Sequence, residues 1–135
     1  MQFHNWAIEQ LPGISNKQQQ QLKEHNIYTT LDLLQVTRSQ LARQQLAQKL
    51  NFHIKHINKW TALAKLASIP SVGCQYCGLL LHAGISSPQQ LAMMPVAQLH
   101  TQLKRLQIKL MHRADLSPET TQVSQWIAEA KQLCQ

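Results

Sequence analysis

The chain contains Leu11-Pro12-Gly13-Ile14-Ser15 and, 58 residues later, Ile69-Pro70-Ser71-Val72-Gly73. Both stretches place an aliphatic residue before a proline, followed by small and aliphatic residues. The same offset aligns further residues, and the apolar pairs are Leu22 with Leu80, Ile27 with Ile85, Leu33 with Leu91, and Leu41 with Leu99. A register kept through so many pairs indicates an internal repeat.

The C-terminal part of each copy repeats as well, but the offset between the two copies is slightly larger there. Trp60-x-Ala62-x-Ala64-Lys65 is answered by Trp126-x-Ala128-x-Ala130-Lys131, now 66 residues later. The second copy therefore carries about eight extra residues, which we place near positions 114–118. We predict two repeats, residues 1–67 and 68–135.

Local signals predict short helices joined by tight turns. Ser15 and Gln18 form a capping-box pattern, which predicts a helix from there to about His25. Asn26 and its counterpart Gly84 suit the left-handed residue that ends such a helix. Further helix starts are predicted at Thr29 with Asp32, Ser87 with Pro88, Thr37 with Gln40, and Ser117 with Pro118.

Composition and periodicity favour an all-α fold. The 135 residues include only 4 glycines and 5 prolines, and 44% of the chain is hydrophobic. No alternating strand pattern of useful length occurs, whereas aliphatic residues recur at helical spacing. The recurring residues are Leu46, Leu50, Ile54 and Ile57, and then Leu99, Leu103, Leu106 and Leu110. We expect the two repeats to pack as one compact unit.

Charge is distributed unevenly along the chain. The formal net charge is +7, and residues 33–114 contain no aspartate or glutamate. That segment carries ten cations: Arg38, Arg43, Lys49, Lys55, Lys59, Lys65, Lys104, Arg105, Lys109 and Arg113. Such a segment attracts polyanions, nucleic acid among them. The alternative is a basic surface that serves solubility and has no specific partner.

The repeated motif resembles the helix-hairpin-helix motif. We call residues 11–15 hairpin one and residues 69–73 hairpin two. Asn26-Ile27 and Gly84-Ile85 close the two matching helices. The whole chain, with its repeated Trp-x-Ala-x-Ala-Lys close, is similar to a bacterial and largely cyanobacterial family of tandem helix-hairpin-helix proteins of unknown function.

The resemblance implies that hairpin backbone contacts a DNA phosphate, with the positive end of the following helix pointing at it. It assigns this contact to Gly13, Ile14, Ser15 and Lys17, and to Ser71, Val72 and Gly73. Each hairpin departs from the glycine–aliphatic–glycine pattern, because Ser15 and Ser71 replace one glycine each. Under the alternative interpretation both hairpins only turn the chain and pack the helices.

Two basic segments extend this prediction. Arg105, Lys109 and Arg113 recur every fourth residue and form one stripe on a helix, flanked by Lys104. The second segment holds Lys49, Lys55 and Lys59. Both are candidates for tracking a nucleic-acid backbone. The alternatives are an ordinary solvated helix face and contact with an anionic membrane surface.

Cys74-x-x-Cys77 is half of a zinc or redox motif. The other half is missing, so we interpret these cysteines as small packing residues and expect no metal and no cofactor. His53 and His56 lack a third ligand nearby. Enzymes that hydrolyse through paired carboxylates or metal need acids that residues 33–114 do not have, so we expect no enzymatic activity.

We hypothesise a non-enzymatic protein that binds nucleic acid without sequence preference, DNA rather than RNA. The other hypothesis is an assembly module that docks an acidic protein, and the cyanobacterial resemblance makes a photosynthesis-related partner one option. Three cysteines are too few for a disulfide framework, and neither a secretory signal nor a long apolar stretch occurs. We therefore expect a cytoplasmic protein with reduced thiols.

Overall fold

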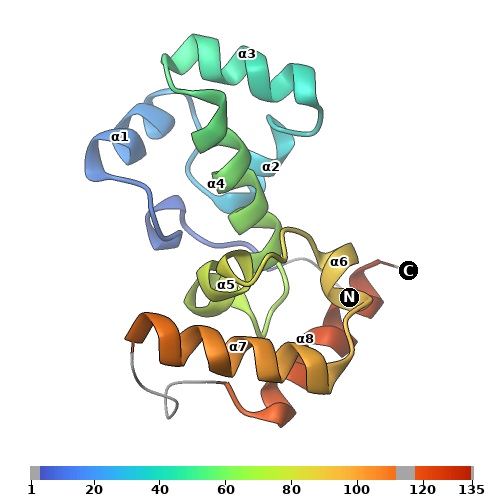
Figure 1. Ribbon diagram of the computed structural model, residues 1–135. Coiled ribbons are helices and arrows are strands. Elements are labelled where there is room, and N and C mark those ends of the chain that lie inside the picture. The colour runs from blue at the N-terminus through green and yellow to red at the C-terminus, as the bar shows by residue number, and fades with distance from the viewer. Residues whose placement is uncertain (1–3, 112–117, 135) are drawn as a thin grey trace.

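The computed structural model describes residues 4–111 and 118–134 and confirms the all-α expectation, since every regular element in those ranges is a helix (Figure 1). The elements are a 3₁₀ turn η1 (Ile8–Gln10) and the helices α1 (Asn16–Glu24), α2 (Thr30–Gln35), α3 (Gln40–Leu50), α4 (Ile54–Ala67), α5 (Gly73–His82), α6 (Pro88–Ala92), α7 (Val96–Met111) and α8 (Thr120–Leu133). Helix α4 runs from α3 at one end of the molecule to α5 near its middle, and α7 and α8 lie at the other end.

Most helix boundaries follow from local caps. The Ser15 hydroxyl accepts a hydrogen bond from the Gln18 backbone amide, and the Gln18 side-chain oxygen accepts one from the Ser15 backbone amide, as the capping box predicts. Asn26 and Gly84 take the predicted left-handed φ angles of 64° and 90°. The starts of α2 and α6 are also confirmed, because Thr29 and Ser87 are their caps.

Two local predictions are wrong, and one run of apolar residues at helical spacing is divided between two helices. Ser39, not Thr37, caps α3, because the buried Thr37 hydroxyl donates to the Leu33 carbonyl instead. The run from Leu46 to Ile57 is two helices rather than one, since Asn51 is left-handed at φ 57° and breaks it. Helix α8 begins at Thr120 with Glu119 as its cap, after the predicted start at Pro118. Ser117 lies outside the described residues.

The two predicted repeats share one hydrophobic core. The pairs Leu22 with Leu80, Ile27 with Ile85, and Leu33 with Leu91 are all buried, with exposed fractions of 2% or less. The fourth pair breaks the repeat, because Leu41 is 63% exposed while Leu99 is 0% exposed. Helices α4 and α5 pack against each other across the predicted boundary at residues 67 and 68.

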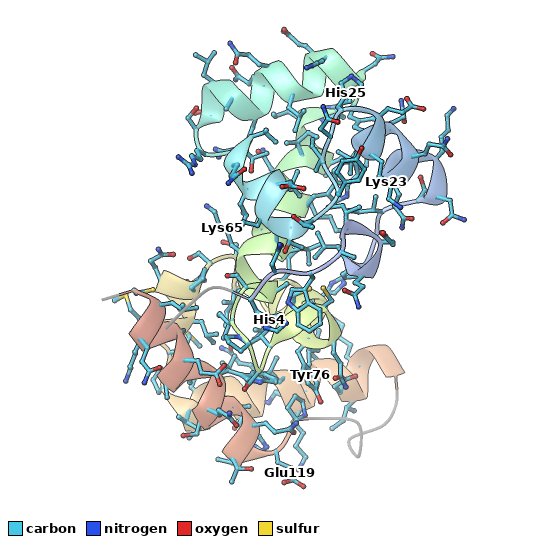
Figure 2. All side chains as sticks on the ribbon, turned by 180° about the vertical axis from the view of Figure 1, so that it is seen from behind. His4, Lys23, His25, Lys65, Tyr76 and Glu119 are labelled. Carbon is cyan, nitrogen blue, oxygen red and sulfur yellow. The ribbon has the colours of Figure 1, made fainter. Side chains whose placement is uncertain are left out.

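The N-terminal segment fastens the two repeats together. Trp6 is held within the first repeat, because its indole donates to the Ala67 carbonyl at 2.7 Å and its backbone pairs with Thr30, and its ring lies against Gly73 of the second repeat. The His4 amide donates to the Ser68 carbonyl, and Figure 2 shows His4 where the two repeats meet. Among the described residues, no helix combines the length and apolar character that crossing a bilayer requires.

Candidate nucleic-acid interface

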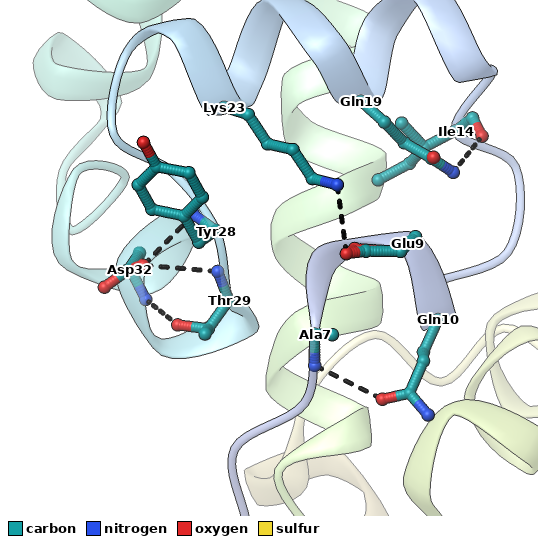
Figure 3. Close-up of polar contacts among 9 residues, drawn as sticks. All are labelled: Ala7, Glu9, Gln10, Ile14, Gln19, Lys23, Tyr28, Thr29 and Asp32. Carbon is teal, nitrogen blue, oxygen red and sulfur yellow. Dashed lines mark hydrogen bonds and ion pairs between the residues drawn. The ribbon is translucent and has the colours of Figure 1, made fainter.

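Hairpin one turns the chain at an exposed glycine. Gly13 has φ 81°, a left-handed angle that favours glycine, and both Pro12 and Gly13 face solvent. The buried Ile14 side chain anchors the far side of the turn in the core, and the Gln19 side chain donates to its carbonyl (Figure 3). Ile14 therefore offers only backbone to a ligand, and Ser15 is committed to capping α1.

Positive charge surrounds this turn. The Lys59 ammonium nitrogen lies 3.6 Å from the position that a Cβ on Gly13 would take. Lys17 is exposed in the first turn of α1, which contains no acidic residue. Within the described residues, no hydrogen bond uses the amides of Asn16 and Lys17. The open start of α1, with the exposed Lys17 in its first turn, therefore follows directly after a turn that has the Lys59 ammonium beside it, which suits an anion.

Two contacts hold hairpin one in place. Lys23 of α1 forms an ion pair with Glu9 of η1 at 3.1 Å, which Figure 3 shows. A backbone hydrogen bond and then the Lys23 partner lower the pKa of Glu9. The Pro12 ring lies 3.6 Å from the position that a Cβ on Gly78 of α5 would take. The turn is therefore packed against both repeats while its outer surface stays open.

Hairpin two has the opposite surroundings, because a carboxylate of α8 occupies it. The Ser71 amide donates to Glu129 Oε1 at 2.9 Å, and the Ser71 hydroxyl donates to Glu129 Oε2 at 2.6 Å. The Trp126 indole donates to the Ser71 carbonyl at 3.1 Å. Gln125 also donates to Glu129. The polar groups of Ser71 are thus all used within the protein.

Gly73 of hairpin two lies beneath Trp6. Val72 and Gly73 are both buried, and Gly73 has φ 54°. A Cβ on Gly73 would lie 2.8 Å from Trp6 Cζ2, closer than side-chain atoms approach one another. None of the three residues assigned here by resemblance, Ser71, Val72 and Gly73, presents a free backbone amide on an open surface.

The predicted basic segments are exposed on two separate parts of the molecule. Lys49 lies in the last turn of α3, and Lys55 and Lys59 lie one turn apart on α4. On α7, Arg105 and Lys109 line a shallow depression of about 290 Å³ with Ala83, the residue that follows α5, and Lys104 is exposed beside them. Arg113 lies outside the described residues. Helix α5 lies between hairpin one and α7 (Figure 1).

The cysteines and histidines considered as metal or redox residues have structural roles instead. Burial raises the pKa of Cys74 to about 11 and that of Cys77 to about 12, which opposes the thiolate that zinc or disulfide exchange requires. His53 accepts from the Lys55 amide as the cap of α4, and His56 stacks on Trp60. In the ranges that the structure describes, no three His, Cys, Asp or Glu side chains gather as a metal site.

Sequence reasoning missed the link between Ser71 and Glu129, although the repeat carries a signal for it. Glu129 follows Trp126 by three residues, and the same place after Trp60 holds the buried Leu63. The copy with glycine after the proline (Gly13) has leucine there, and the copy with serine after the proline (Ser71) has glutamate. The two substitutions belong together, because the carboxylate binds the serine.

The chain belongs to the family described as "Domain of unknown function (DUF4332)", whose model matches residues 12–133 and so covers hairpin two and all of hairpin one except Leu11. No curated protein and no solved structure matches the chain.

Proposed function

We propose that this member of the family binds nucleic acid without sequence preference, DNA rather than RNA, and performs no chemistry on it. In this proposal hairpin one is a working helix-hairpin-helix motif. Hairpin two has become a structural joint. The three free thiols fit a cytoplasmic location, which is part of the same proposal.

The observation that carries the proposal is the exposed corner at Gly13. Its glycine leaves room for a phosphate to approach the backbone, and Lys17 and Lys59 supply positive charge at that point. A phosphate held there gains from the free amides at the start of α1 and from the helix dipole. Because phosphates carry no base identity, such a contact positions nucleic acid without reading its sequence.

The remaining cations extend the contact along a backbone. Lys49 and Lys55 are exposed on the helices that lead to Lys59, and Arg105 and Lys109 are exposed on α7. An interface that neutralises about five phosphates loses roughly 2–3 decades of affinity between about 50 and 200 mM salt. The salt dependence therefore measures how many of these cations take part.

The test is a fluorescence anisotropy titration of labelled DNA duplexes of two unrelated sequences and of labelled RNA at those two salt concentrations. We expect both duplexes to bind equally, with steep salt dependence, and RNA to bind more weakly. Binding that is absent at low salt, or that survives high salt unchanged, contradicts the proposal. Equal or tighter binding of RNA contradicts its DNA preference.

A charge-matched pair of variants locates the contact. Lys59→Glu reverses a cation beside Gly13, whereas Lys131→Glu reverses an exposed cation in the last turn of α8. We expect Lys59→Glu to weaken duplex binding about tenfold at low salt and to reduce the salt slope by about one. Lys131→Glu changes only the net charge, so equal losses in the two variants place the contact elsewhere.

A further inference from the structure

A depression that the nucleic-acid proposal does not use lies where the two repeats meet. Its volume is about 360 Å³, and it is bounded by α2, the end of α4 and the start of α6. Leu31, Leu34 and Pro88 give it an apolar end, and Leu31 is 42% exposed. Lys65 lines its edge, and Figure 2 shows this lysine on α4 at the level of the junction.

A second depression of about 460 Å³ adjoins the first at Lys65, which lines both. It lies between α3, α4 and the turn before α6. Arg43 lines this part and is held in place, since it donates to Asn58 at 3.0 Å and to the Thr37 carbonyl at 3.1 Å. We call the two depressions together the Lys65 groove.

The charges of the groove all have one sign. Its charged lining residues are Arg38, Arg43 and Lys65, and no carboxylate lines it among the residues described. In that part of the chain, neither Arg38 nor Lys65 lies within ion-pair distance of an acid. An apolar end next to unpaired cations matches a ligand that combines an apolar group with negative charge.

We propose that the Lys65 groove docks an acidic peptide segment of a partner protein. A large apolar side chain of that segment occupies the end formed by Leu31, Leu34 and Pro88, and its carboxylates face Arg38 and Lys65. A peptide fits better than a nucleic-acid duplex, because the bases of a duplex are stacked inside it and its outer sugar-phosphate backbone has no large apolar group to bury at this end. This proposal is independent of hairpin one and of nucleic-acid binding.

The test uses the ¹⁵N-labelled full chain and a set of synthetic peptides in which one leucine or phenylalanine is flanked by glutamates. Control peptides carry glutamines in place of the glutamates. We expect the acidic peptides to shift backbone amides of α2, of the end of α4 and of the start of α6, and the controls to leave them unchanged. Absent shifts at millimolar peptide, or equal shifts from the controls, overturn the proposal.

Two variants and one competing ligand complete the experiment. Lys65→Glu changes an exposed side chain, and we expect it to weaken peptide binding at least about tenfold, because like charges then meet across the groove. Lys131→Glu, with the same charge change on α8, should alter binding less than about twofold. Equal losses in both variants, or shifts of the groove amides by duplex DNA in place of the peptides, overturn the assignment.

Discussion

Gly13 and Gly73 both take left-handed φ angles in turns of related sequence, yet Gly13 faces solvent and Gly73 lies under Trp6. The cation Lys59 lies beside hairpin one. The anion Glu129 lies against hairpin two and accepts the hydrogen bond of the Ser71 amide, which a ligand would need. The comparison shows that neighbouring side chains, more than the turn itself, decide whether such a hairpin is open to a ligand.

The same comparison explains how one chain keeps two copies of a motif with different roles. Hairpin two is held from two sides, since the Trp6 ring of the first repeat lies against Gly73 and the Trp126 indole donates to the Ser71 carbonyl. It joins the two repeats. Hairpin one carries no such cover and keeps its outer surface free.

The largest effect should come from adding a methyl group to the covered glycine. Gly73→Ala places a Cβ 2.8 Å from Trp6 and in a left-handed conformation, so we expect a loss of about 3 kcal/mol in the free energy of unfolding. Chemical denaturation followed by circular dichroism measures it. Gly84→Ala is the control, because Gly84 is also left-handed but has no atom within 4 Å of its Cβ position, and we expect about 1 kcal/mol. Equal losses would show that Trp6 does not cover hairpin two.

A smaller difference should separate two buried tryptophans. Trp126 donates to the Ser71 carbonyl, whereas the Trp60 indole nitrogen has no partner among the described residues. Trp126→Phe and Trp60→Phe remove similar volume, but only the first breaks a hydrogen bond. We therefore expect Trp126→Phe to reduce the free energy of unfolding by about 1 kcal/mol more than Trp60→Phe, in the same denaturation assay. The reverse order would mean that this bond does not hold hairpin two.

The smallest effect should come from neutralising the internal anion. Glu129→Gln keeps the shape but replaces one of the two oxygens that accept from Ser71 with an NH2 donor and removes the charge, so we expect a loss of about 1 kcal/mol in stability. The variant gains one unit of positive net charge, which should raise duplex affinity by less than about threefold. We expect no larger gain, because Trp6 still covers Gly73. A gain of tenfold or more in the anisotropy titration would mean that Glu129 alone closes hairpin two.

Local interactions were predictable from the sequence and distant ones were not. Ser15 with Gln18 and Thr29 with Asp32 were predicted because both partners lie within one helical turn. The pairing of Ser71 with Glu129 needs chain segments far apart in sequence, which a motif alone does not bring together. The position of Lys59 beside Gly13 was missed for the same reason.

Apolar periodicity also failed to reveal a helix boundary, because the helical spacing of apolar residues continues across the break between α3 and α4. The spacing from Leu46 to Ile57 suits one helix, but the left-handed Asn51 ends α3 and redirects the chain into α4. The repeat also predicted equal roles for Leu41 and Leu99, yet Leu41 lies on the outer side of α3. Sequence alone thus predicted the helical class and most caps, and tertiary packing decided which copy of each feature is exposed.

The most direct test of the account follows the backbone amides of both hairpins while duplex DNA is added to the ¹⁵N-labelled protein. We predict that the NMR signals of the backbone amides of residues 13–17 shift progressively as DNA is added and that the signals of residues 71–73 do not change. Shifts confined to hairpin two, or shifts that leave hairpin one untouched, would contradict the claim that the open, lysine-flanked hairpin is the one that binds phosphate.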